Sequence, residues 1–590
     1  MKETMKKSFN ILSVAAIATL TLLISGCQDF LTIYPTDKVV LENYWKNKED
    51  VETMVANSYR KMTEKGFIDR LVVWGELRSD DVCEGTNIST ELKYINDANL
   101  LPSNSYCSWS NFYSVINNCN IVMKFAPTVL DEDPDFTQGD MDVIRGEMLA
   151  IRALCHFYLV RTFRDIPLLM EAMVDDSQDL YQDQVPPLVA LDSILVDLYE
   201  AEGLVMASGS YNNLTYNKGR ITADAVRAMI ADVMLWKAAF TQYTNKSDGS
   251  DCYAFYTTCI DYCEQIIKDR NQYLIEYEKR NNFGRTSGNE GPSDPLLVGY
   301  PLNTYPTNIG MTSSTDPYST LFGMTQNDLK ESIFEIQGHM DNNRHYATND
   351  LYGCIGHAAP FNATSTLGGT GTDVNIYKNT DMRRYSFTKG KEGEDDVYDI
   401  AKYTQTNVTF TSTNLPYKTA YVARTTNQEK DVGYYSSTNW IVYRITDVML
   451  MEAEALALRN DSTLGDEAKA FKLVKATYYR SNPTKVARND SINLNNGIVP
   501  LVREERQREL CFEGKRWYDL VRWALREGST TSMLTELVGR KYETNQNAVK
   551  SKMANIDKLF FPISEDQIKT SNGHLKQNPS YNTEDVYQKY

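Results

Sequence analysis

Residues 505–523, which read ERQRELCFEGKRWYDLVRW, decide the fold. They span the junction of two predicted helices. We expect the first helix to cover 501–513 and to stop at Gly514, and the second to cover 516–526 and to stop at Gly528. A glycine just after the last turn is a common helix terminator, so both positions fit the prediction.

Two carboxylates of this stretch, Glu509 and Glu513, are four residues apart and share one helical face. Paired carboxylates can serve as acid and base in an enzyme, which is one interpretation. The second interpretation is structural, because Asp519 has Arg516 and Arg522 at helical spacing and an ion-pair network would hold the helices together. The basic residues around the carboxylates are Arg506, Arg508, Lys515, Arg516 and Arg522. We favour the network and predict no catalytic residue.

Three more segments, 141–160, 221–240 and 443–458, show apolar residues at alternating steps of three and four, which predicts helices. Helix pairs with Ala at their packing points resemble tetratricopeptide units, although insertions break the period of about 34 residues. We predict a mainly α fold of tetratricopeptide-like helix pairs with few short strands. Ordinary amphipathic helices in a mixed fold are the alternative.

The region 281–440 differs from the rest of the chain. It is rich in Gly, Pro, Asn, Thr and Ser and loses helical periodicity, and such long irregular regions are usually functional or disordered. Its many aromatic residues argue against disorder. We therefore predict a loop-rich, ligand-facing insert between a helical N-terminal half (41–280) and helical repeats (441–527). A closing tail (528–590) completes a single domain over 41–590.

The N-terminus carries an export signal. A basic start is followed by an apolar run over 9–24 and by Ser and Gly directly before Cys27. The run is shorter than the roughly 20 residues that span a bilayer, and small residues at its end are typical of a signal-peptide cleavage site. We predict a signal peptide over 1–26, a lipid (palmitate) on Cys27 as in bacterial lipoproteins, and a tether over 27–40.

Composition bears on the class of partner. The net charge of −17 disfavours nucleic acid as a partner, because binding to phosphates depends on clustered Lys and Arg. The 38 Tyr residues supply apolar ring faces with a polar edge, a surface that suits sugars and peptides alike.

The sequence predicts no metal site and no cofactor site. Besides Cys27 the chain has nine Cys, an odd number, so we expect mostly buried free thiols. Cys252, Cys259 and Cys263 cluster without a C-x-x-C pair or a nearby His, and the five His have no metal-ligand spacing. No phosphate-binding glycine loop is present either.

Two regions combine aromatic rings with amides and carboxylates, as a sugar site requires. The first is the Trp74 to Tyr94 segment, and the second is the set of loops from Tyr300 to Tyr352. The candidate ligand residues are Trp74, Tyr94, Tyr300, Tyr305, Tyr318, Phe322 and Tyr352. We expect Asp80, Asp81 and the acidic run 394–396 to be solvated loop carboxylates, with calcium binding at 394–396 as an alternative.

At 505–523 the sequence resembles the SusD/RagB family of outer-membrane lipoproteins. The family pattern is approximately E-R-x-x-E-L-x-F-E-G-x-R-W-x-D-L-x-R-W, and this chain satisfies every fixed place. Further matches follow in order along the chain, at Cys27–Leu31, Tyr44–Asn47, Trp109–Asn120, Ile151–Ala153, Asp165–Leu169, Ser332–Ile336, Tyr443–Arg444, Glu452–Ala455, Phe561–Ile563 and Gln577–Pro579.

The resemblance implies a SusD-like fold in a lipoprotein that is anchored through Cys27 to the outer membrane and faces the cell exterior. It implies a non-catalytic role in nutrient uptake, in which the protein captures an oligosaccharide and delivers it to a SusC-like TonB-dependent transporter. RagB-like members imply capture of peptide instead, and the sequence leaves both ligands open. Two more hypotheses stay open at this point, a surface glycoside hydrolase and a scaffold that binds only the transporter.

Overall fold

The structure is a computed structural model. It describes residues 41–581 except 42, 176–177, 180, 212, 281–296, 298, 305–316, 323–327, 329, 339–346, 354–358, 365–375, 379–380, 391–397, 404–407, 411–418, 422–437, 483–491, 535–540 and 543–544. The predicted signal peptide, Cys27, the tether, Tyr305, Cys354 and the run 394–396 lie outside the described residues.

The N-terminal half is built from helices. They are α3 (Lys48–Thr63), α4 (Lys65–Val72), α5 (Thr90–Asn96), α6 (Ser110–Phe125), α7 (Gln138–Phe163), α8 (Pro187–Glu202), α9 (Leu214–Gly219), α10 (Ala223–Asn245) and α11 (Tyr253–Arg280). Shorter turns are the π-helical η1 (Val73–Leu77) and the 3₁₀ turns η2 (Ser105–Cys107), η3 (Ala126–Asp131) and η4 (Ser250–Cys252). Two short strands, β2 (Ile166–Pro167) and β3 (Gln184–Val185), pair with each other.

The described part of 281–440, together with the strand that follows it, contains only short elements. Its helices are α12 (Pro317–Phe322), α13 (Ala347–Tyr352) and α15 (Arg383–Phe387). Its strands are β4 (Ser332–Ile336), β5 (Phe361–Ala363), β6 (Thr388–Gly390), β7 (Tyr398–Ile400), β8 (Val408–Phe410), β9 (Thr419–Tyr421) and β10 (Trp440–Arg444).

The C-terminal part returns to helix. Its helices are α16 (Ile445–Arg459), α17 (Asp466–Ser481), α19 (Ile498–Leu510), α20 (Arg516–Glu527), α22 (Gln546–Met553) and α23 (Glu565–Thr570), with 3₁₀ turns η7 (Ile556–Leu559) and η8 (Pro579–Tyr581).

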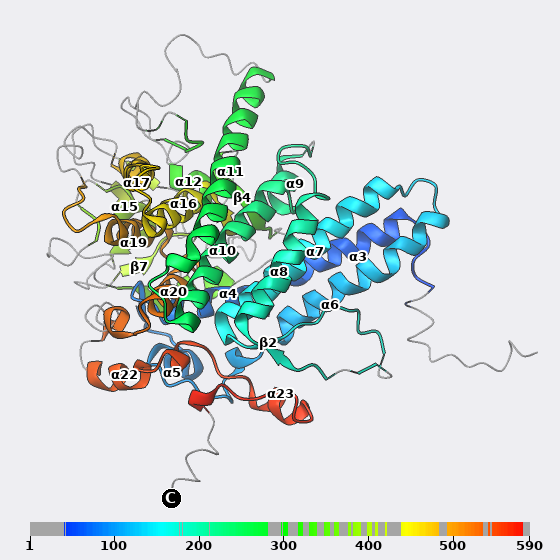
Figure 1. The fold of residues 1–590 in the computed structure, drawn as a ribbon, viewed down its shortest axis with the longest axis horizontal. Helices are drawn as coiled ribbons and strands as arrows, with labels where there is room; N and C mark the ends of the chain where they lie inside the picture. The colour runs from blue at the N-terminus through cyan, green and yellow to red at the C-terminus, as the bar shows by residue number, and fades with distance from the viewer. Residues whose placement is uncertain are drawn as a thin grey trace, which may run out of the picture.

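The long helices pack in series along the chain. α3 contacts α6, α6 contacts α7, and the series continues through α8, α10, α11, α16, α17 and α19. Figure 1 shows α3, α6, α7 and α8 side by side, with α11 running across the middle of the molecule. This stacking of each helix on its neighbours confirms the mainly α fold with tetratricopeptide-like units.

Local chemistry explains where the central helix α7 starts and ends. Thr137 accepts a hydrogen bond from the backbone N–H of Asp140, whose side chain bonds back to the Thr137 N–H, so the first turn is closed by a capping box. At the opposite end Arg164 has a φ of 71°, which leaves the helical region and ends the helix. The interior residues of α7 are almost all buried, as a helix flanked on both sides requires.

Two predicted helices have wrong boundaries. The predicted helix 443–458 begins inside a strand. Residues Trp440–Arg444 form β10, which pairs with β4, and helix α16 begins only at Ile445. The W-I-V-Y run has high strand propensity, which explains the error. Helix α19 ends at Leu510, earlier than Glu513, while α20 is followed by Gly528 in the left-handed region, as predicted.

The buried hydrophobic side chains form one contiguous cluster that extends from α3 to the C-terminal helices. Trp74, Trp236, Trp440 and Trp517 are among its largest fully buried members. Over the described ranges, no helix combines the length and apolarity that a membrane crossing needs.

Candidate functional site

The turn between α19 and α20 holds the 505–523 stretch in an unusual backbone path. Phe512 and Gly514 both have positive φ, at 66° and 68°. The backbone N–H of Phe512 donates to the buried carboxylate of Glu76 in η1, and Tyr352 donates to the Phe512 carbonyl at 3.0 Å. The turn therefore contacts both the N-terminal half and the insert.

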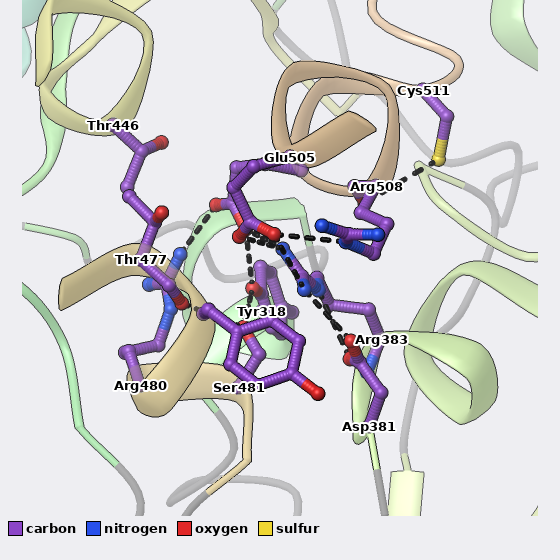
Figure 2. Close-up of polar contacts among 12 residues, drawn as sticks. Tyr318, Asp381, Arg383, Thr446, Thr477, Arg480, Ser481, Glu505, Arg508 and Cys511 are labelled. Carbon is purple, nitrogen blue, oxygen red and sulfur yellow. Dashed lines mark hydrogen bonds and ion pairs between the residues drawn. The ribbon is translucent and has the colours of Figure 1, made fainter. Parts of the chain in front are cut away.

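Glu509 lies at the centre of a fully buried ion-pair network. Its carboxylate accepts hydrogen bonds from Arg444 at 2.7 Å, from Arg383 at 3.0 Å and from Arg480. The Tyr318 hydroxyl donates to it at 2.8 Å. Figure 2 shows Tyr318, Arg383 and Arg480 converging on the helix that carries Glu505. These partners come from α12, α15, β10 and α17, so one carboxylate connects the insert to the helical frame.

A second carboxylate extends the network. Glu513 accepts from Arg444 at 2.7 Å and from Lys402 at 2.6 Å. Arg383 also pairs with Asp381 at 2.7 Å and with Glu505 at 2.7 Å. The ion-pair interpretation of the 505–523 stretch is confirmed.

The predicted basic residues take part in the same way. Arg506 and Arg522 both pair with Asp519, at 2.9 and 2.8 Å, and Arg516 pairs with Asp80 at 2.7 Å. Arg508 pairs with Glu505 at 2.9 Å.

The network keeps its carboxylates ionised. Burial alone would raise the pKa of Glu509, but Arg480, Arg444 and Arg383 outweigh it and hold that pKa well below its usual range. Arg444 and Lys402 likewise lower the pKa of Glu513 against the effect of burial. A carboxylate that stays ionised and fully bonded offers no proton to a substrate, so this pair is suited to structure rather than to acid catalysis.

The expectation that Asp80 and Asp81 are solvated is wrong. Both are fully buried. Gln507 donates to Asp80 at 3.0 Å and to Asp81 at 2.7 Å, and Arg516 balances the charge of Asp80. These partners replace the water that would solvate the carboxylates, and they offset the free-energy cost of burying two adjacent charges.

The first candidate ligand region, Trp74 to Tyr94, shares one sheet with strands from the 281–440 insert that lie after Tyr352. Strand β1 (Val82–Glu84) pairs antiparallel with β5, and the sheet order is β1-β5-β7-β6. The Gly85 N–H extends the pairing to the Pro360 carbonyl at 2.7 Å. Helix α5, which carries Tyr94, packs beside β1. The segment after Trp74 and the described strands of the insert are therefore joined by backbone hydrogen bonds.

Four of the predicted ligand residues are core residues. Trp74, Tyr318, Phe322 and Tyr352 are buried. The Trp74 indole N–H and the hydroxyls of Tyr318 and Tyr352 form hydrogen bonds within the protein. Trp74 stacks on Phe112 with ring centroids 4.9 Å apart. Burial removes these four rings from any surface that a soluble ligand reaches in this structure.

Tyr94 and Tyr300 remain accessible. Tyr94 is 39% exposed on α5, next to Lys93, which pairs with Glu84 of β1. Tyr300 is half-buried, and burial raises its pKa to about 12. The Lys472 ammonium lies 5.8 Å from the Tyr300 ring centroid. The ammonium lies over one face of the ring, so that face of Tyr300 is engaged within the protein.

The described cysteines confirm the prediction of mostly buried free thiols. Cys83, Cys107, Cys119, Cys155, Cys252, Cys259, Cys263 and Cys511 are free, and all but Cys83 are buried. In the part of the chain that the structure covers, no group of three or more His, Cys, Asp or Glu side chains is arranged to hold a metal ion.

Sequence reasoning missed several partners of the network, notably Arg383, Lys402 and Arg480. They lie 126, 111 and 29 residues from the carboxylates they bond, and nothing local marks them. The signal that points to them is the excess of carboxylates and basic residues in the 505–523 stretch, which indicates a network without naming its distant members.

Comparison with known proteins agrees with this architecture. A profile of the SusD family matches residues 324–581. The SusD-like protein P38 of Formosa agariphila is 24% identical over 535 residues, which cover 88% of this chain and 92% of that protein.

Solved structures share the fold. A SusD homolog from Bacteroides thetaiotaomicron matches with a TM-score of 0.64 at 17% identity, covering 92% of this chain and 98% of that one. A laminarin binding SusD-like protein matches with a TM-score of 0.58 at 18% identity, covering 91% and 100%. The motif with its buried network, the relatives along most of the chain and the shared fold give one conclusion: residues 324–581 match the SusD family, and the chain has the fold of the solved SusD-like proteins.

Proposed function

We propose that the chain is a non-catalytic lipoprotein of the outer membrane that captures an oligosaccharide at the cell surface and delivers it to a SusC-like TonB-dependent transporter. Cys27 carries the lipid, and residues 27–40 form the tether. A lipid anchor keeps the binding domain at high local concentration over its transporter.

The observation that carries the proposal is the sheet β1-β5-β7-β6, which joins the segment around Tyr94 to the insert. Tyr94 supplies an exposed aromatic ring on α5, and Lys93 of the same helix pairs with Glu84 of β1. We assign the ligand to this surface, with Tyr94 as its described contact, and Tyr300, which lies beside Lys472 of α17, stays a separate candidate.

Two further observations support the proposal. A solved protein of the same fold is a laminarin binding SusD-like protein, and laminarin is a glycan. The carboxylate pair that suggested hydrolysis is buried and engaged in ion pairs, which favours capture over cleavage.

The test is binding of the purified protein to an array of algal, plant and host glycans, followed by calorimetry with the strongest binder and chromatography of the incubated glycan. We expect saturable binding and an unchanged glycan. Saturable binding of peptides with no glycan binding would favour the RagB-like function, and shortened glycan products would indicate a hydrolase.

A further inference from the structure

A large groove lies in the N-terminal half, away from helix α5 and Tyr94. Its volume is about 830 Å³, and α3, the start of α7, residues 206–220 and the end of β4 line it. In Figure 1, α3 and α9 lie well apart from α5 and β7. The volume is within the range of roughly 300–1,000 Å³ that is typical of small-ligand sites.

A single buried carboxylate organises one wall of the groove. Glu147 of α7 is fully buried and accepts hydrogen bonds from the hydroxyls of Tyr59 at 2.5 Å and Tyr211 at 3.0 Å. Arg220 pairs with the same carboxylate at 2.8 Å. The Tyr59 hydroxyl also accepts from the Ile221 N–H at 3.0 Å. Three side chains of the lining are therefore fixed in position before any ligand arrives.

Two tyrosine rings contact each other on this wall. Tyr211 and Tyr216 meet edge to face with centroids 6.2 Å apart, and the Arg220 guanidinium lies 5.5 Å from the Tyr211 centroid. Tyr216 is 51% exposed, so much of its ring faces solvent. An exposed ring held against a fixed one is available for stacking and contributes little to the core.

A polar edge accompanies the rings. The Gln337 amide donates to the Thr215 carbonyl at 2.8 Å, which holds it across α9. Gly219 allows this close approach, because a Cβ there would overlap the Gln337 amide. The groove thus presents ring faces, an amide and a guanidinium together.

The charge of the groove favours a neutral ligand. Its lining carries four carboxylates and three cationic side chains, and Lys48 is paired with Asp140 at 3.0 Å. Buried apolar residues such as Val55, Ile144 and Ile336 contribute to the lining. Because charges of both signs are present, the groove has no field of one sign that would attract a polyanion or a polycation.

From this geometry we propose that the groove is a second carbohydrate site, which takes a short neutral oligosaccharide with a sugar ring stacked on Tyr216 and hydroxyl groups bonded to Arg220 and Gln337. The inference rests on the proposed function for its ligand class, and it assigns that class to a surface separate from the one around Tyr94. Two sites on one chain would hold a long glycan at two points and raise its effective affinity.

The test is calorimetry of the purified protein with the oligosaccharide that binds most strongly on the glycan array. The wild-type protein is expected to bind two oligosaccharides per chain. Tyr216→Ala is expected to bind one, with affinity at the groove reduced about tenfold or more. Tyr216→Phe keeps the ring and is expected to retain both. Tyr199→Ala removes a ring on α8 that is 45% exposed and lies outside the groove, and it is the matched control.

The outcomes separate this inference from the proposed function. Binding of one oligosaccharide per chain that Tyr216→Ala leaves unchanged overturns the groove assignment and leaves the proposed function standing. Failure to bind any glycan on the array overturns both. Binding of peptides from a casein digest that Tyr216→Ala abolishes, without glycan binding, overturns the carbohydrate assignment of the groove.

Discussion

Gly75 of the π-helical turn packs directly on Gly514 of the 505–523 stretch, so closely that a Cβ at position 75 would overlap the Gly514 carbonyl oxygen. The Gly514 backbone has a φ of 68°, a conformation that glycine adopts without strain. This contact of two glycines, together with the bond from the Phe512 N–H to Glu76, joins the N-terminal half to the buried network.

The first prediction concerns this contact. Gly75→Ala is expected to lower the free energy of unfolding by about 1–3 kcal/mol, because the added methyl forces the two backbones apart. Gly139→Ala is the control, since a Cβ there would lie 3.7 Å from the Thr137 hydroxyl, an ordinary contact. Denaturant unfolding measures both. Equal stability of the two variants would contradict the close packing.

The second prediction concerns the centre of the network. Glu509→Gln removes the charge that balances Arg383, Arg444 and Arg480 while keeping the side-chain shape. Loss of one partner from a buried ion pair typically lowers stability by about 3–5 kcal/mol. Glu565→Gln breaks an exposed pair with Lys569 and should change stability by less than about 1 kcal/mol. If both variants unfold alike, the network does not stabilise the fold.

The third prediction concerns pH. Glu452 on α16 is buried, and burial together with Glu264 raises its pKa to about 8, although Lys469 and Lys472 oppose the shift. Its Oε2 has no hydrogen-bond partner among the described residues. Burial likewise raises the pKa of Glu331 to about 7. The unfolded chain releases these protons near pH 4.5, so stability falls as pH rises from there towards 7 to 8.

Glu452→Gln removes one of these titrations. Below about pH 4.5 the variant should match the wild type in slope, and between about pH 5 and 8 its stability should fall less steeply, by up to about 1.4 kcal/mol per pH unit. The lowered pKa values of Glu509 and Glu513 act only at lower pH and do not mask the effect. Denaturant unfolding at about pH 5, 6.5 and 8 measures the slopes. Identical slopes in variant and wild type would show that Glu452 does not titrate in this window.

The fourth prediction concerns the anchor. Cys27→Ala is expected to release the protein from the cell surface while its glycan affinity stays within about twofold of the wild type, because the lipid holds the domain and does not shape its site. Fractionation of cells and calorimetry of the released protein measure the two effects. A weaker affinity in the released protein would mean that the tether contributes to binding.

Much of the helical frame could be predicted from the sequence because its signal is local. The apolar steps in 141–160 and 221–240 correspond to α7 and α10, since one helical face repeats every three or four residues. The segment 440–444 could not be assigned in this way. Its apolar run satisfies a helix and a strand equally, and pairing with the distant β4 decides between them.

The candidate site was harder to predict because ring burial depends on tertiary contacts. Tyr318 and Tyr352 stand in polar, loop-like sequence, yet their hydroxyls bond to Glu509 and to the Phe512 carbonyl inside the core. The groove was missed for a related reason. Tyr59, Glu147 and Tyr211 come from three separate segments, and no spacing in the sequence shows that they meet.

The most direct test of the central claim, that this chain captures glycan on the surface around Tyr94, is calorimetry with the oligosaccharide selected on the array. Tyr94→Ala is expected to weaken binding at that surface about tenfold or more, because an exposed aromatic ring dominates such contacts, while Tyr199→Ala binds like the wild type. Wild-type affinity in Tyr94→Ala, or no glycan binding by the wild-type protein, would contradict the account.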